Sequence, residues 1–337
     1  MQIYRSLAEL PTPMPRTVAA IGNFDGVHRG HREVIARVLD RARALHSSTA
    51  PVQAIAVTFD PHPLALLHPE RAPQLITPLP QRLRLLAQTG LDATLVIPFT
   101  LEFSRLSARQ FAQDILCQTL HVAEVHEGDT FRFGHNAAAG IEDLRELGRA
   151  CSFDVVSHGA FQIRGIPISS SEVRRRISAG QLGMARALLG RSFSILSAPV
   201  RDRGVGTKLN TPTINFAPYA ELLPPNGVSV TRIRLGDEPG APLCNAVTNI
   251  GVRPTFDAGF AIETHLLDGP PPIDLTESTP LELSFLLRLR DEQRFPNPDA
   301  LKSQILKDVA HAQKYFRRAS ANWREPSPPA PSTLAPL

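Results

Sequence analysis

The first half of the chain alternates short apolar runs with longer segments of mixed polarity. The apolar runs have the length of strands: 17–21, 52–59, 93–99, 121–128 and 153–158. Between them, apolar residues three or four positions apart predict helices: 31–46, 80–89, 107–120 and 139–150. The run at 52–59 is nearly continuous in apolar residues, as expected of a strand buried on both faces. This alternation predicts an α/β domain with a parallel sheet.

After about residue 190 the helical periodicity gives way to short apolar segments punctuated by Pro and Gly. These segments are 193–200, 211–216, 227–235, 243–256, 261–267 and 281–287. They predict an antiparallel β-barrel domain, which the segment 298–317 closes with a helix. We therefore expect one domain over 1–185 and a second over 186–320. The Pro-rich tail over 321–337 is expected to be disordered, because its composition cannot bury a core.

The bulk composition narrows the function without deciding it. The chain has 337 residues, of which 42% are hydrophobic and 20% charged, and this suits a globular protein of about two domains. Its net charge of +4 and pI of about 9.2 suit anionic ligands such as nucleotides. No basic stretch is interleaved with the aromatic residues that nucleic-acid binding requires, so no nucleic-acid partner is expected.

The cysteines and the N-terminus indicate a reducing compartment. Cys117, Cys151 and Cys244 are too far apart in sequence to form a zinc or disulfide pattern. The N-terminus lacks the apolar core of a signal peptide, and no apolar run approaches the ~20 residues that span a bilayer. We expect a cytoplasmic protein with no membrane partner.

The most informative segment, GNFDGVHRGH at 22–31, joins the first predicted strand to the first helix. Gly22 and Gly26 allow the backbone to approach a ligand closely, and the helix start offers free N–H groups to an anion. His28 and His31 are three positions apart, so both rings can point toward one phosphate chain. There they can donate hydrogen bonds as charge moves onto a departing pyrophosphate. The segment favours phosphate chemistry on a nucleotide.

Two simpler interpretations of the histidine pair stay open. The pair could form half of a zinc site, although the sequence offers no third and fourth ligand at a suitable spacing. The two residues could also be ordinary surface histidines at the start of a helix. The glycines around them, directly after a strand, favour the phosphate site over both.

Several motifs in order resemble those of the bifunctional riboflavin kinase/FMN adenylyltransferases, the prokaryotic FAD synthetases. After GNFDGVHRGH come TFDPHP (58–63), PFTLEFSRLSARQF (98–111), GDTFRFG (128–134) and ISSSEVR (168–174). The last resembles the Ser-Ser-[Ser/Thr]-x-x-Arg segment by which this nucleotidyltransferase superfamily holds triphosphate. Serine hydroxyls at a helix start and Arg174 would make a second anion clamp. The resemblance implies a Rossmann-like first domain that adenylylates FMN.

The resemblance also implies the residues of the first site. His28 and His31 would stabilise the transition-state charge as the FMN phosphate attacks ATP, with no covalent intermediate. The residues expected to bind ATP are Gly22, Asn23, Phe24, Gly26, Gly30, Ser170, Ser171 and Arg174. Mg²⁺ would accompany the triphosphate. Thr130 stands where the family usually has an acidic or amide residue, which leaves the contact made there open.

The resemblance continues through the second domain to about residue 317. PTIN (212–215) resembles the Pro-Thr-x-Asn motif of riboflavin kinases, which implies that Thr213 and Asn215 hold magnesium and phosphate. NIGVRPTF and IETHLLD follow in order, and Glu263 stands where the family places its catalytic base, near the riboflavin 5′-hydroxyl. Taken without the resemblance, Glu263 is a solvent-facing strand carboxylate and PTIN is a turn.

The nucleotide loop of the second domain departs from the family pattern. Ser197 and Asp202 stand where glycines are usual, and Asn210 with Thr211 replaces a Gly-Phe pair. Loops that approach phosphates closely need glycine, so the sequence leaves the kinase activity open.

The function predicted is a bifunctional enzyme that uses ATP to make FMN from riboflavin and FAD from FMN. One alternative is an FMN adenylyltransferase whose degenerate second domain binds flavin and regulates the first. Another is a related enzyme that acts on a different phosphate-bearing acceptor, such as nicotinamide mononucleotide or phosphopantetheine.

Overall fold

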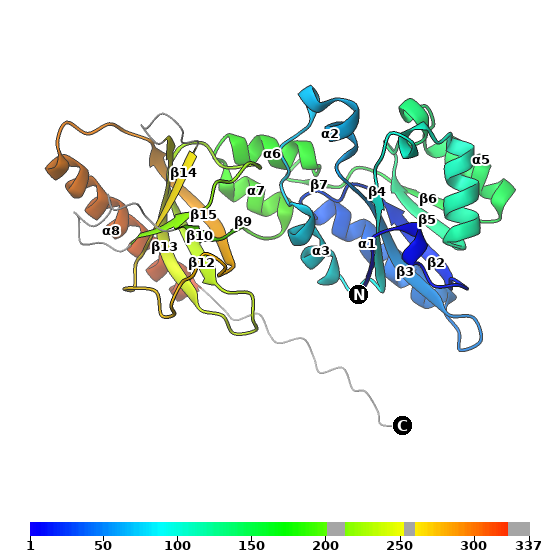
Figure 1. Ribbon diagram of the computed structural model, residues 1–337, viewed down its shortest axis with the longest axis horizontal. Coiled ribbons are helices and arrows are strands. Elements are labelled where there is room, and N and C mark those ends of the chain that lie inside the picture. The colour runs from blue at the N-terminus through cyan, green and yellow to red at the C-terminus, as the bar shows by residue number, and fades with distance from the viewer. Residues whose placement is uncertain (201–212, 253–259, 323–337) are drawn as a thin grey trace. The chain divides into compact units, whose positions relative to one another are not determined.

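The computed structural model describes residues 1–200, 213–252 and 260–322 (Figure 1). The chain divides into two compact units, which part at Leu196. The first unit comprises Met1–Ile195 with Ala220–Pro225, and the second comprises Leu196–Tyr219 with Asn226–Leu337. Asp202, Asn210 and Thr211 lie outside the described residues, as does the tail from residue 323 onward. Among the described helices, none combines the length and the apolar character that crossing a bilayer requires.

The first unit is built on a six-stranded sheet in the order β1-β4-β3-β2-β5-β6. Its strands are β1 Gln2–Tyr4, β2 Arg16–Ile21, β3 Val52–Asp60, β4 Ala93–Pro98, β5 Val122–Gly128 and β6 Asp154–His158. All neighbouring strands are parallel, which confirms the predicted parallel sheet. The chain passes from β2 to β3 and β4 on one side, then returns to β5 on the other side. Such a reversal opens a crevice between the carboxyl ends of the two central strands, here β2 and β5, where α/β folds bind ligands.

Helices cover both faces of this sheet. The helices of this unit are α1 Arg29–Leu45, α2 Pro63–Leu67, α3 Leu79–Ala87, α4 Ala108–Gln110, α5 Ile141–Cys151, α6 Ser170–Ser178 and α7 Leu182–Leu189. Of these, α1 and α3 pack on one face of the sheet and α5 on the other. The predicted helix 107–120 continues beyond α4 as a π-helix over Phe111–Thr119, and at its end the Leu120 N–H donates to the Ile115 carbonyl. A small hairpin pairs β7 Gln162–Ile163 with β8 Ile166–Pro167.

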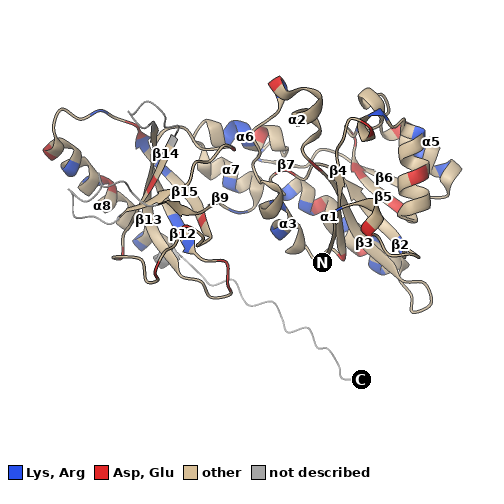
Figure 2. Cartoon of the chain, viewed as in Figure 1, with Lys and Arg blue, Asp and Glu red and all other residues tan. Residues whose placement is uncertain are grey.

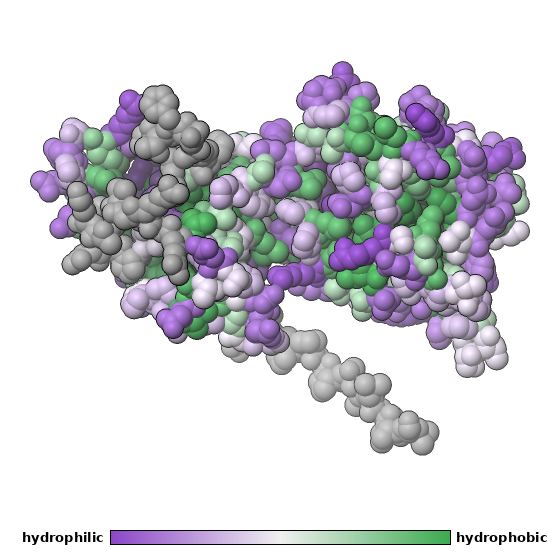
Figure 3. Space-filling model, in the orientation of Figure 1, coloured by the Kyte–Doolittle hydropathy of each residue, from purple (hydrophilic) through white to green (hydrophobic). Residues whose placement is uncertain are grey.

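The two faces of β2 explain why its sequence is apolar without alternation. Val18 and Ala20 pack with α1 and α3, whereas Ala19 and Ile21 pack with the π-helix and α5. Successive side chains of a strand point to opposite faces, so both sets must be apolar when helices cover both sides. The outer face of α5 is hydrophilic, as Figure 3 shows, and carries the exposed charged residues Glu142, Glu146 and Arg149.

The second unit is built on a curled seven-stranded sheet in the order β10-β11-β14-β13-β12-β15-β9. Its strands are β9 Phe193–Ser197, β10 Pro199–Val200, β11 Thr213–Phe216, β12 Gly227–Leu235, β13 Leu243–Val252, β14 Phe260–Leu266 and β15 Leu281–Asp291. The pairings from β10 through to β15 are antiparallel. Helix α8, Pro298–Asn322, packs Ala312 and Phe316 against Val228, Val230 and Val247. The predicted antiparallel β domain that ends in a helix is confirmed.

Candidate functional site

The loop from Gly22 to His28 joins β2 to α1 beside the crevice between β2 and β5. Gly26 has a φ of 85°, and a Cβ there would lie 3.2 Å from Ile76 Cδ1. Both facts require glycine at that position. Phe24 and Val27 also hold positive φ angles although they are not glycines. Such backbone strain persists only where the surrounding structure fixes the loop.

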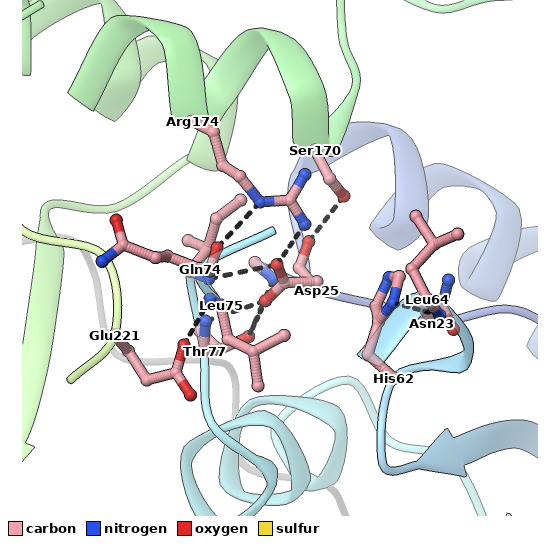
Figure 4. A network of polar contacts seen from close by, with 12 residues as sticks. Asn23, Asp25, His62, Leu64, Gln74, Leu75, Thr77, Ser170, Arg174 and Glu221 are labelled. Carbon is pink, nitrogen blue, oxygen red and sulfur yellow. Dashed lines mark hydrogen bonds and ion pairs between the residues drawn. The ribbon is translucent and has the colours of Figure 1, made fainter. Parts of the chain in front are cut away.

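Asp25 is the residue that fixes the loop (Figure 4). Its carboxylate is buried and accepts the N–H groups of Ile76 at 3.0 Å and Thr77 at 2.8 Å. From α6, the Arg174 guanidinium donates to the same carboxylate at 2.7 Å, and the Ser170 hydroxyl donates to the Asp25 backbone carbonyl at 2.8 Å. Asp25 therefore connects the loop to the segment before α3 and to the start of α6.

The three serines at the start of α6 lie in different environments. Ser169 is a helix cap, because its hydroxyl accepts the N–H of Glu172, while Ser170 faces the loop. Ser171 is exposed. Arg175 and Arg176 both pair with Glu172 on the same helix, where basic and acidic side chains lie together (Figure 2). Only Arg174 of the arginine run therefore reaches the loop.

His28 and His31 lie at the first turn of α1 with their rings stacked, 3.6 Å between centroids and 15° between planes. Burial lowers the pKa of His28 to about 4, although Asp25 partly opposes the shift. Burial also lowers the pKa of His31 well below its usual value, and His28 adds to this effect. Both imidazoles are therefore neutral at pH 7.

The hydrogen bonds of the pair assign the proton of His28. Its Nδ1 accepts the backbone N–H of His31 at 3.2 Å, so the proton of the neutral ring is on Nε2. His28 thus caps α1 with one nitrogen and keeps an N–H donor on the other. His31 Nδ1 is buried and has no hydrogen-bond partner. Unpaired buried polar atoms are uncommon and are typical of binding sites.

A cavity of about 630 Å³ lies over this loop. Its walls come from the loop and the start of α1, the ends of β5 and β6, and the segment before α6. The predicted site residues that line it are Gly22, Phe24, His28, Gly30, His31 and Ser170. The predicted residues outside this lining are Asn23, Gly26, Ser171 and Arg174. Thr130 lines the cavity, together with its neighbour Asp129.

Two residues of this site were missed by sequence reasoning. Arg82 of α3 is 1% exposed and donates to the carbonyl of Asn23 at 3.0 Å, and burial lowers the pKa of its guanidinium. An arginine between Gln81 and Leu83 in a helical pattern gives no signal of this role. Glu127 lies near the end of β5, and burial raises the pKa of its carboxyl to about 8. Its only signal is a carboxylate at the carboxyl end of an apolar run.

The second site lies on one face of the second sheet. Asn215 on β11 is opposite Glu263 on β14, and Glu263 is opposite Asn249 on β13. Residues opposite each other on antiparallel strands share a face, so the three side chains form a row. Thr213, two positions before Asn215, lies on the same face. The sheet therefore brings together Thr213, Asn215 and Glu263.

Two cavities meet at Thr213 in this unit. One, of about 420 Å³, lies between the sheet and α8 and is largely apolar, with Glu263, Asn249 and His265 among its polar residues. The other, of about 200 Å³, is lined by Thr213, Asn215, Thr276 and Glu277, among others. Glu263 and Thr213 are both exposed to solvent. This arrangement gives room for an apolar ring system beside a smaller pocket of mixed polarity.

Comparisons with known proteins match both domains of the chain. A family model for FAD synthetase matches residues 11–172, and one for riboflavin kinase matches residues 189–316. The bifunctional riboflavin kinase/FMN adenylyltransferase of Escherichia coli (strain K12) is 35% identical over 320 residues, which are 94% of this chain and 98% of that protein. This chain belongs to the bifunctional riboflavin kinase/FMN adenylyltransferase family. The relative from Pseudomonas fluorescens is 34% identical over 317 residues, 93% of this chain and 97% of its own length.

A solved structure also shares the whole fold. The crystal structure described as a macrolide-efflux protein from Streptococcus pneumoniae aligns with a TM-score of 0.77 and covers 96% of this chain and 99% of its own. Its sequence is 23% identical, so this likeness bears on the fold alone.

Proposed function

We propose that the first domain adenylylates FMN with ATP and that the second phosphorylates riboflavin with ATP, so that one chain converts riboflavin to FAD. Family membership supports both activities, because the relatives match along both domains. The cavity that gathers His28, His31 and Ser170 over a glycine-containing loop carries the assignment of the first reaction. The experiment is incubation of the chain with riboflavin, ATP and Mg²⁺, followed by chromatography. We expect FMN to appear first and FAD after it. Absence of both products refutes the kinase activity, and absence of FAD when FMN is supplied directly refutes the adenylyltransferase activity.

In the first reaction, a phosphate oxygen of FMN attacks the α-phosphorus of ATP. The new oxygen–phosphorus bond forms as the bond to pyrophosphate breaks, and no strong base is needed because the FMN phosphate is already ionised at pH 7. The N–H on Nε2 of neutral His28 donates to the oxygens that gain charge, with His31 beside it. The free N–H groups at the start of α1 bind the phosphates.

In this proposal, Arg174 and Ser170 act by positioning the loop that contains Asp25. Both donate to Asp25, so they hold the start of α6 against the loop that precedes α1. Two helix N-termini are then fixed on either side of the triphosphate. Positioning of this kind is worth several kcal/mol in a reaction between two bound substrates.

In the second reaction, the riboflavin 5′-hydroxyl attacks the γ-phosphorus of ATP and ADP leaves. The Glu263 carboxylate accepts the hydroxyl proton as the oxygen–phosphorus bond forms. The larger cavity beside Glu263, which is largely apolar, suits the flavin ring, and the smaller cavity, which holds Thr213 and Asn215, suits the phosphates.

Mg²⁺ fits the oxygen donors of β11. The hydroxyl of Thr213 and the amide oxygen of Asn215 lie on one face of the strand and line the smaller cavity. Mg²⁺ prefers oxygen ligands and leaves positions for substrate phosphates and water, so two protein donors are enough. When bound, it supplies positive charge that neutralises the transferred phosphoryl group.

The cytoplasm is the compartment we propose. All three cysteines are free thiols. Cys117 and Cys151 are neighbours, because the Cys117 thiol donates a hydrogen bond to the Cys151 carbonyl at 3.5 Å. Neighbouring free thiols are typical of a reducing compartment.

A further inference from the structure

Glu127 lies where the sheet of the first domain opens into its crevice. The parallel pairing of β2 with β5 extends to Ala20 and His126. One residue further, the Ile21 N–H donates to Oε1 of the Glu127 carboxyl at 2.5 Å. At the point where β2 and β5 separate, the Glu127 side chain therefore accepts the N–H that a backbone carbonyl would accept in a continuing sheet. The next residue, Gly22, begins the loop that leads to the histidine pair.

Among the described residues that line the cavity with Glu127, none is a lysine or arginine that would favour its ionised form. The side chain is 7% exposed and lines the 630 Å³ cavity, whose described lining includes no lysine or arginine. The titratable groups that share this lining are His28 and His31 from the start of α1, Asp129 from the end of β5, and His158 from β6.

The three histidines around this cavity are uncharged at neutral pH. Burial is the main reason that the pKa values of His28, His31 and His158 are lowered. Burial likewise raises the pKa of Glu127 to about 8, although the N–H groups of Ile21 and Gly128 oppose the shift. The Glu127 carboxyl, which lines the cavity, is therefore mostly protonated and uncharged at pH 7.

We propose that Glu127 is a positioning residue of the FMN adenylyltransferase site that works as an uncharged carboxylic acid, and that loss of its proton turns FMN adenylylation off. The inference rests on the proposed assignment of that reaction to this cavity. The uncharged carboxyl holds the Ile21 N–H, and so fixes the start of the phosphate-binding loop. It also adds no negative charge to the cavity beyond the exposed Asp129, which matters because both substrates, FMN and ATP, are anions.

Ionised Glu127 changes the binding of substrates more than it changes the loop. A carboxylate still accepts the Ile21 N–H, so the loop keeps its anchor. The new negative charge, however, lies on the wall of a cavity with no lysine or arginine in its described lining, so it repels a phosphate that binds there. We therefore expect the loss of activity to appear mainly as a higher KM for FMN and ATP.

The experiment measures kcat/KM for FAD formation from FMN, ATP and Mg²⁺ between pH 6 and pH 9.5. For the wild type we expect an alkaline limb, in which kcat/KM falls about tenfold per pH unit above the Glu127 pKa of about 8. Glu127→Gln keeps an oxygen that accepts the Ile21 N–H but cannot ionise, so it should show no such fall. Glu127→Met, which lacks the acceptor as well, should be slower at every pH and should also lack the limb.

Two controls separate this effect from others. Riboflavin phosphorylation by the same samples uses a flavin and ATP at the other site, and it should lack the limb near pH 8. Asp129→Asn removes an exposed carboxylate that lines the same cavity, and the limb should stay at the same pH because Glu127 is unchanged.

An alkaline limb retained in both Glu127 variants, or absent from the wild type, overturns the inference. Its failure is distinct from failure of the site assignment. If a chain with His28→Ala and His31→Ala still forms FAD, the assignment itself is wrong. If that chain forms no FAD while the Glu127 variants keep the limb, the assignment stands and only the inference falls.

Discussion

At the scale of single residues, His28 has two tasks that can be separated. Its Nδ1 caps α1 by accepting the His31 N–H, and its Nε2–H faces the proposed reaction. His28→Ala should lower kcat/KM for FAD formation by about 10²–10³-fold, the usual effect of losing one transition-state donor. It should also lower the free energy of unfolding by about 1 kcal/mol through loss of the cap.

His28→Asn is the matched control for this prediction. Asparagine is a good N-cap residue, so the variant should recover the stability measured by urea unfolding. Its shorter side chain should not recover the rate. If the rate and the stability recover together, His28 serves only as a cap and the proposed mechanism loses its main donor.

Glu127 also links stability to pH in a direction that can be stated. Its pKa is raised from 4.5 to about 8 in the folded protein, so its contribution to stability is fully present below pH 4.5 and is lost as the pH rises toward 8. The loss is at most on the order of 5 kcal/mol. We expect the unfolding free energy of the first domain to fall over this range in the wild type relative to Glu127→Gln. Parallel pH curves for the two proteins would show that the carboxyl is ionised in the fold.

At the scale of elements, one buried ion pair joins α6 to the loop, next to the hydrogen bond from Ser170 to the Asp25 carbonyl. Arg174 is the cation that reaches the buried Asp25 carboxylate at 2.7 Å. Removing one partner of a buried pair leaves an uncompensated charge, so Arg174→Ala should lower the free energy of unfolding by about 3 kcal/mol. FAD formation should fall as well, because the loop loses its hold on α6.

Arg175→Ala is the matched control on the same helix. Arg175 lies on the exposed face of α6 and pairs with Glu172, so its loss should change stability and FAD formation little. Chemical denaturation of the two variants, followed by fluorescence or circular dichroism, measures the difference. Equal effects from both substitutions would contradict a special role for Arg174.

The register of β11, β14 and β13 makes a separate prediction for the second domain. It places Glu263 directly opposite Asn215, on the face that also carries Thr213. Loss of a general base typically costs ~10²–10⁴-fold in rate, so Glu263→Gln should lower kcat for FMN formation within that range. Riboflavin binding should change much less, because the carboxylate acts after docking. An unchanged rate in rapid-quench assays would remove Glu263 from the mechanism.

At the scale of the whole molecule, the sequence predicted most elements because their periodicity is local. The segments 52–59 and 31–46 correspond to Val52–Asp60 and Arg29–Leu45. The edge strand Gln2–Tyr4 was missed, because three residues carry no period. The segment 107–120 was predicted to be helical, but a hydrophobic pattern does not distinguish an α-helix from the π-helix found over Phe111–Thr119.

The candidate sites were predictable to the extent that turn chemistry and the family motifs specify them. Gly26 needs glycine for its positive φ, and His28 stands at a helix start, so both could be found from the sequence. Arg82 and Glu127 could not, because their burial results from the order of strands and from α3 packing beneath the loop. Arg174 was expected at the triphosphate, whereas in the structure its guanidinium binds Asp25. Asp25 lies 149 positions before Arg174 in the sequence, so the local pattern around Arg174 does not indicate this contact.

The central claim is that one chain holds two separate sites that act in sequence. The most direct test gives riboflavin, ATP and Mg²⁺ to a chain that carries both His28→Ala and His31→Ala, and separates the flavins by chromatography. The account predicts that FMN accumulates at close to the wild-type rate while FAD formation is strongly reduced. An equal loss of both products would show that the two reactions are not divided between the domains in this way, and would contradict the account.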